Sequence, residues 1–137
     1  SKIVSAPNTA VRITCDQEGI LTDSHMSNVG IGPGANYKIA GAQDEYGCPE
    51  FDHLWDHENR PAVPEAYYDR AEADMIRIAK EFVAKYPSIG AIMLECTGMQ
   101  MFARAIQREL DLPVWSWGTL LDHAFSVVAH RDYYGHI

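Results

Sequence analysis

The stretch SIGAIMLECTGMQMFARAIQR, residues 88–108, decides how we expect the chain to fold. It begins with a short apolar run at residues 89–94, whose length is that of a strand and whose composition predicts burial on both faces of a sheet. Apolar residues then recur at helical spacing between Met101 and Ile106. A buried strand followed by a helix is half of a βαβ unit, so the stretch predicts an α/β fold.

Cys96 lies at the turn between this strand and this helix. In open parallel sheets, ligands bind beyond the carboxyl ends of the strands, which is where the turn is expected. Unpaired N–H groups at the start of a helix and the helix dipole favour a thiolate, so we expect a lowered pKa and a catalytic role for Cys96. The opposing interpretation is a small buried apolar residue, as free cysteines often are.

The rest of the chain repeats the alternation of strands and helices. Three more strands are predicted, at residues 10–15, 36–41 and 114–117. Three more helices are predicted, at residues 22–29, 64–86 and 118–130. The last helix should bury an apolar stripe formed by Leu120, Leu121, Phe125 and Val128. Residues 42–64 show no periodicity and predict a functional loop, with Cys48 as an exposed thiol.

These elements predict one α/β lobe over residues 1–137, with a four-stranded, mostly parallel sheet flanked by helices and a flavodoxin-like arrangement. Residues 1–9 are interpreted as a linker. Residues 131–137 form an aromatic tail that is expected to dock on another surface, such as another subunit.

The composition narrows the classes of function. The chain has 137 residues and a formal net charge of −8, which argues against a nucleic-acid partner, because phosphate contacts need a basic face. No apolar segment approaches the roughly 20 residues that span a bilayer, so no membrane partner is expected. Three cysteines without framework spacing favour a reducing compartment, and we expect a cytoplasmic protein.

Several residues could bind a substrate near Cys96. The Thr97 hydroxyl and the N–H groups of Thr97, Gly98 and Met99 could hold a carboxylate, although Thr97 could equally be a simple N-cap. Thr14 and Cys15 end the first predicted strand. They should open onto the same crevice, because the carboxyl ends of parallel strands share one edge of the sheet.

The histidines do not predict a metal site. His53 and His57 are four residues apart, but their segment lacks helical support and no spacing places a third ligand. His123 and His130 share a helix face, which surface positions explain equally well. The sequence shows no glycine fingerprint in the context that a dinucleotide needs, and we expect neither metal nor cofactor.

The segment AIMLECTGM at residues 91–99 resembles the second cysteine motif of the aspartate/glutamate racemase superfamily. VRITCD at residues 11–16 is similar to the strand that opens the second half of such enzymes, and GILTDSHM at residues 19–26 is similar to the helix after it. The resemblance extends to Leu112-Pro113-Val114 and the final helix. It covers most of this chain but only the C-terminal half of a family member.

The resemblance implies two α/β lobes that each donate one cysteine to opposite sides of a substrate α-carbon. One thiolate removes a proton and the other thiol returns one, without a cofactor. It implies that Cys96 is the catalytic acid or base of this lobe. It also implies that the substrate is a small carboxylate-bearing compound, such as an amino acid, a hydantoin or a related acid, held by Thr97 and backbone N–H groups.

The chain departs from the family at two points. Gly98 stands where glutamate racemases carry a histidine, which disfavours that subgroup. No first lobe with its own cysteine motif is seen, so we expect a fragment, a homo-oligomer, an association with a missing first lobe, or a one-cysteine mechanism. The alternatives from other classes are a non-catalytic anion-binding lobe and an interaction subunit.

Overall fold

The structure is a computed structural model of the chain. It describes residues 9–14, 23–32, 34–43, 46–55, 58, 60–132 and 134–135. Helices and strands alternate along these residues around a small parallel sheet, so the predicted α/β combination is confirmed.

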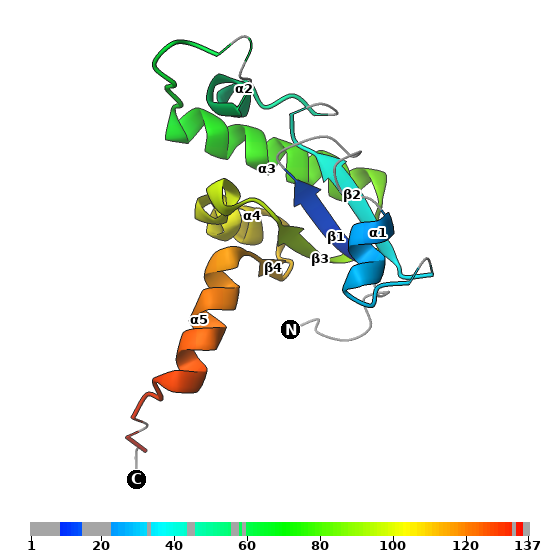
Figure 1. Ribbon diagram of the computed structural model, residues 1–137, viewed down its shortest axis with the longest axis vertical. Helices are drawn as coiled ribbons and strands as arrows, with labels where there is room; N and C mark the ends of the chain where they lie inside the picture. The colour runs from blue at the N-terminus through cyan, green and yellow to red at the C-terminus, as the bar shows by residue number, and fades with distance from the viewer. Residues whose placement is uncertain are drawn as a thin grey trace.

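The sheet has the strand order β2-β1-β3-β4, and each neighbouring pair is parallel (Figure 1). Its main strands are β1 (Thr9–Thr14), β2 (Tyr37–Gly41) and β3 (Ile89–Leu94). The edge strand β4 has only two residues (Val114–Trp115), whereas residues 114–117 were expected. The strand is shorter because Ser116 caps the next helix, and Trp117 is already helical.

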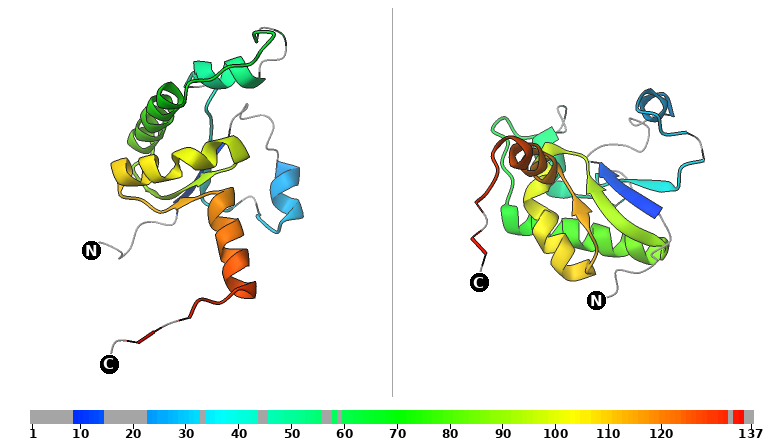
Figure 2. Two further views of the ribbon diagram at one scale, coloured as in Figure 1. Left: turned by 90° about the vertical axis from the view of Figure 1, so that its left-hand side faces the viewer. Right: turned by 90° about the horizontal axis from the view of Figure 1, so that it is seen from below.

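Two helices cover one face of the sheet. These are α3 (Tyr68–Lys85) and α4 (Ala103–Leu110), which lie on the same side of the strands (Figure 2). The short 3₁₀ helix η1 (Thr97–Phe102) joins β3 to α4. The core between these layers consists mainly of buried apolar side chains: Met75, Ile78, Ala79, Phe82, Ile92, Leu94, Met99, Phe102, Ile106 and Val114.

β3 is buried more deeply on one face than on the other, so the predicted burial on both faces holds only in part. Ile92 and Leu94 are buried, whereas Met93 between them is 43% exposed. Successive side chains of a strand point to opposite faces, so Ile89, which is also buried, lies on the face of Met93. A continuous apolar run in the sequence does not reveal how the cover of one face changes along the strand.

The helix α3 begins four residues later than the predicted residue 64. Tyr67 at its N-cap is extended, and its N–H donates to Oε2 of Glu50 at 2.9 Å. Glu50 belongs to α2 (Pro49–Trp55), a seven-residue helix within the segment 42–64, where no regular structure was expected. The correction has a physical reason: seven residues make only two turns, and such a helix shows little periodicity.

Cys48 precedes α2 and is fully buried in the core cluster, so the prediction of an exposed thiol is also wrong. The amino-terminal helix α1 (Asp23–Asn28) lies within the predicted residues 22–29. Gly30 follows it with a φ of 77°, a left-handed conformation that glycine adopts without strain.

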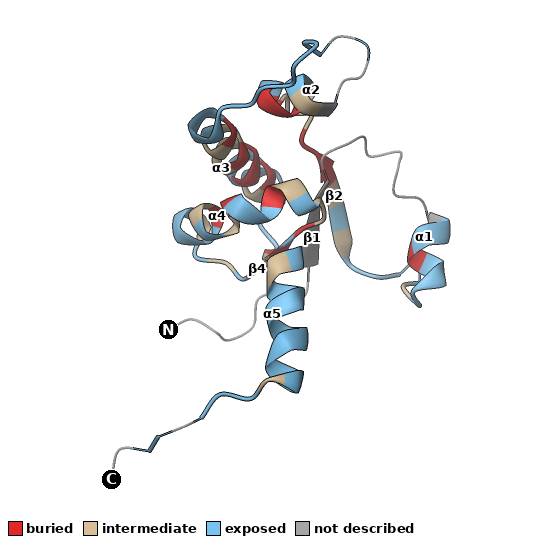
Figure 3. Cartoon of the chain, turned by 60° about the vertical axis from the view of Figure 1, so that its left-hand side comes forward, coloured by how far each residue is buried: buried red, intermediate tan, exposed pale blue. Residues whose placement is uncertain are grey.

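The last helix, α5 (Trp117–Val128), does not bury its apolar stripe as predicted. No residue of α5 is buried, and Leu120, Leu121, Phe125 and Val128 are all more than half exposed (Figure 3). The helix contacts β4 and η1 at its start and then leads away from the body (Figure 1). The amphipathic pattern predicts a helix correctly, but the pattern cannot say whether another part of the chain covers its apolar side chains.

Candidate functional site

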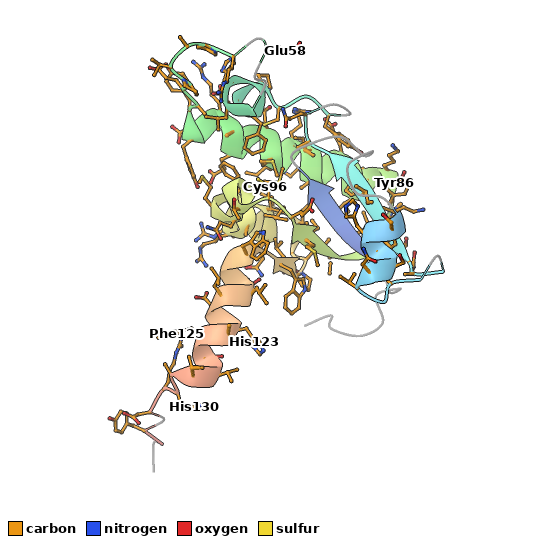
Figure 4. The ribbon with its side chains drawn as sticks, in the orientation of Figure 1. Glu58, Tyr86, Cys96, His123, Phe125 and His130 are labelled. Atoms are coloured by element: carbon orange, nitrogen blue, oxygen red, sulfur yellow. The ribbon has the colours of Figure 1, made fainter. Side chains whose placement is uncertain are left out.

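Cys96 follows β3 at the carboxyl edge of the sheet and is the N-cap residue of η1 (Figure 4). Its backbone is extended, with φ −74° and ψ 138°, and its Sγ accepts a hydrogen bond from the Gly98 N–H at 3.4 Å. The side chain is partly buried against the core. The turn therefore holds the sulfur by this hydrogen bond, in a residue that is neither buried nor fully exposed.

Gly98 leaves space beside this sulfur. A Cβ at Gly98 would lie 3.6 Å from Sγ of Cys96, an ordinary van der Waals distance, so an alanine fits there. Hydrogen bonds from an N–H to sulfur favour the thiolate over the thiol, because the negative sulfur is the better acceptor.

The N–H groups of Gly98 and Met99, which were predicted to hold a carboxylate, already donate hydrogen bonds within the turn. The Met99 N–H donates to the carbonyl of Cys96 at 3.0 Å, and the Met99 side chain is fully buried in the core. The Gly98 N–H is directed at the sulfur. Thr97 is exposed, so its hydroxyl is the predicted substrate-binding group that solvent reaches.

The start of α5 forms a second wall of the site that the sequence did not indicate. The indole Nε1 of Trp117 donates to the carbonyl of Glu95 at 2.6 Å, which ties α5 to the residue before Cys96. A Cβ at Gly118 would lie 3.4 Å from Oε1 of Gln100 in η1, so α5 and η1 approach closely at this glycine.

A capping box holds the first turn of α5 in place. The Thr119 N–H donates to Oγ of Ser116, and the Ser116 N–H donates to Oγ1 of Thr119 at 2.9 Å. Ser116 is 8% exposed and directly follows β4, at the same edge of the sheet as Cys96. The spacing Ser-x-x-Thr is close to the capping-box signature and could have shown that the helix begins at Trp117.

Thr14 ends β1 at this same edge. Ile13 pairs with Leu94 and Thr14 pairs with Gly41, so the backbone of Thr14 lies beside the end of β3. Cys15 lies outside the described residues, and the expected meeting of Cys15 and Cys96 across a substrate stays a prediction.

Among the described residues, the histidines singled out from the sequence lie away from Cys96 (Figure 4). His53 lies in α2 and its Nδ1 is 3.9 Å from Oε2 of Glu50, while His57 lies outside the described residues. His123 and His130 lie along and just beyond α5 on its way out from the body (Figure 4). Within the described residues, no group of three or more His, Cys, Asp or Glu side chains could hold a metal ion.

One tyrosine near η1 has a shifted acidity. The Tyr68 hydroxyl donates to Oε2 of Glu72 at 2.8 Å, and this hydrogen bond is the main cause that raises the pKa of Tyr68, with desolvation and the charges of Glu72 and Asp69 adding to it. The same hydroxyl lies 3.4 Å from the carbonyl of Met101. Tyr68 therefore connects the first turn of α3 with η1 and stays protonated near neutral pH.

Comparisons with protein-family models, curated proteins and solved structures found no match to this chain. Among the helices in the described part of the chain, none has the length and apolar character needed to cross a membrane.

Proposed function

We propose that this chain is a flavodoxin-like lobe of a cofactor-independent racemase or isomerase that acts on a small carboxylate-bearing substrate. Cys96 is the acid or base that moves the α-proton. The single observation that carries the proposal is the position of the Cys96 sulfur, held at the carboxyl end of β3 by the Gly98 N–H. The resemblance of residues 91–99 to a racemase cysteine motif supports the same assignment.

The proton transfer balances with two groups. The Cys96 thiolate takes the α-proton and becomes a thiol, while the electron pair of the C–H bond stays on the substrate as a planar, carboxylate-stabilised carbanion. An acid on the opposite face then returns a proton to the α-carbon. Cys15 is the candidate for that acid within this chain, and a cysteine of a further lobe is the candidate outside it.

The surroundings of Cys96 suit a base for a weak carbon acid. Such a base must be held close to the substrate and partly shielded from water, because a hydrated thiolate is a weaker base. Cys96 is partly buried, and the exposed Thr97 hydroxyl beside it can donate to the substrate carboxylate. Trp117, bonded to the carbonyl of Glu95, limits the space on the side of α5.

Exchange of the substrate α-proton in heavy water tests the proposal. The wild-type chain is incubated with a panel of amino acids, hydantoins and related acids, and deuterium incorporation is followed by NMR or mass spectrometry. We expect exchange with at least one class of substrate and a loss of two orders of magnitude or more, about 10²-fold, in Cys96→Ser.

Cys48→Ala is the matched control, because Cys48 is a buried cysteine of the core rather than of the site. It should retain exchange at the wild-type rate per folded molecule, measured after circular dichroism has confirmed the fold. Equal exchange in wild type and Cys96→Ser would remove Cys96 from the mechanism.

A further inference from the structure

A broad apolar surface lies on α5. We call it the α5 patch, and it consists of six large side chains that are 44% to 81% exposed: Trp117, Leu120, Leu121, Phe125, Val127 and Val128. Single exposed apolar residues are ordinary, but a row of six on one helix is not.

The polar residues of α5 form one narrow stripe. Thr119, Asp122, His123 and Ser126 follow the spacing i, i+3, i+4, i+7, which places them on the same side of the helix. At about 100° per residue, the large apolar side chains span roughly 160° of the circumference, from Val127 to Phe125. A helix with an apolar arc of this width normally packs it against another surface.

A second apolar surface lies on the face of the sheet opposite α3 and α4 (Figure 2). Met93 is 43% exposed and Trp115 is 59% exposed. The two residues are register partners on β3 and β4, so their side chains lie side by side on the same face. We call this pair the open sheet face. Parallel sheets are normally covered on both faces, and here α3 and α4 cover the other one.

The combined area matches that of a protein–protein interface. With 150–250 Å² on each aromatic side chain and somewhat less on Val, Leu and Met, the exposed fractions of the α5 patch and the open sheet face amount to roughly 900 Å². Each partner of a standard interface buries about 800 Å². The largest apolar patch of a monomer is usually about 300–600 Å².

We propose that two copies of this chain associate about a two-fold axis, with the α5 patch of each copy packed on the open sheet face of the other. The α5 patch is on a helix and the open sheet face is on the sheet of the same molecule. A two-fold axis makes the contact between them twice, so one symmetric interface covers both surfaces of both copies. The inference does not depend on the chemistry at Cys96.

The charges of α5 permit this association. Although the chain has a formal net charge of −8, the only ionisable side chains of α5, all of whose residues are described, are Asp122 and His123. Both lie on the polar stripe. Two copies can therefore meet through the α5 patch without burying like charges against one another.

Sedimentation velocity across a range of protein concentrations tests the association. We expect wild type to have twice the mass of one chain, and Phe125→Glu to sediment as a single chain because it buries a charge in the patch. Ser126→Glu is the matched control: it introduces the same side chain at the next position, on the polar stripe, and should remain a dimer.

The proposal is overturned if wild type is monomeric at every concentration, or if the two variants behave alike. Circular dichroism establishes first that both variants keep the wild-type helix content. A monomeric wild type would point instead to a further lobe of a longer chain as the group that covers the patch.

Cross-linking tests the arrangement of the two copies. Ala124→Cys places a thiol within the apolar arc of α5, and Met93→Cys places one on the open sheet face. A short bis-maleimide should join the two variants when they are mixed, above the background given by wild type. If Ala124→Cys alone gives as much cross-linked dimer as the mixture, the two α5 helices pack on each other and the proposed arrangement is wrong.

Discussion

At the scale of single residues, Cys48 and Cys96 have the same side chain in two different environments. Cys48 is fully buried in the core between β2 and α2, with no surface left for a reagent. Cys96 is partly exposed at the end of β3, and its sulfur accepts a hydrogen bond from the Gly98 N–H. The position in the fold, rather than the residue type, separates an inert thiol from one that can react.

Iodoacetamide should therefore distinguish the two thiols in the folded protein. We expect Cys96 to be alkylated at least about 10-fold faster than Cys48, because alkylation of a fully buried thiol requires an opening of the core. Mass spectrometry of peptic fragments gives each rate separately. In denaturant the two rates should converge, and equal rates in the native protein would contradict the burial of Cys48.

Tyr68 provides a prediction on pH. Its pKa is raised, first by the hydrogen bond to Glu72, so the folded chain holds the phenolic proton more tightly than the unfolded chain does. This contribution to stability is complete below the unfolded pKa of about 10 and is lost as the pH rises through the folded value. Ultraviolet titration should show that Glu72→Gln lowers the pKa of Tyr68, and an unchanged midpoint would contradict this cause. Glu81→Gln, on the same helix but away from Tyr68, is the control.

At the scale of elements, Glu50 ties α2 to the start of α3. Its carboxylate is nearly buried, accepts the N–H of Tyr67 and lies 3.8 Å from the guanidinium of Arg70. The contact explains why the chain remains extended up to Tyr67 and becomes helical only at Tyr68. It also packs the short helix α2 against a longer one.

Glu50→Ala should lower the free energy of unfolding by about 1–3 kcal/mol, because the N–H of Tyr67 loses its acceptor in a partly buried place. Glu50→Gln keeps an acceptor oxygen and should cost less. Urea unfolding followed by circular dichroism measures both. Equal losses in Glu50→Gln and Glu50→Ala would show that the charge matters more than the hydrogen bond.

The order of the elements could be predicted from sequence because each long element carries its own signal. The β-branched run near Ile13, the run at residues 89–94 and the capped α5 need only local information. α2 could not be predicted, since two turns carry too little periodicity. The exposure of Met93 and of the α5 patch could not be predicted either, since exposure depends on what covers a surface and not on the residues that form it.

The candidate site was predicted in part. The position of Cys96 follows from a strand that ends in a small polar turn, and the turn is found there. The contact of Trp117 with the carbonyl of Glu95 could not be predicted, because it depends on how α5 meets the end of β3. Local sequence patterns describe one element at a time, and this contact joins two.

At the scale of the whole molecule, the core and α5 are separate in their packing. The core lies between the sheet, α3 and α4, and α5 buries no residue in it. Ser116 and Thr119 complete the cap of α5 where it meets the body. The α/β body should therefore fold without the rest of the helix.

A chain that ends at Thr119 should keep a cooperative unfolding transition, with a free energy of unfolding within about 1 kcal/mol of the monomeric full-length variant Phe125→Glu. Its circular dichroism should lose only the helical signal of α5. Thermal or urea unfolding of the two proteins provides the measurement. A truncated chain without a cooperative transition would mean that α5 stabilises the body.

The contact between Trp117 and Glu95 gives the molecule an optical reporter. The indole of Trp117 donates a hydrogen bond to Glu95, the residue before Cys96. Trp115, two residues before Trp117 in the sequence, lies on the open sheet face. Modification of Cys96 should alter the emission of the first indole, and coverage of the sheet should shift the emission of the second to shorter wavelength. Trp117 also belongs to the α5 patch, so Trp115→Phe should report both the modification of Cys96 and the association, whereas Trp117→Phe should report the association alone, each above the emission of Trp55 that both variants retain.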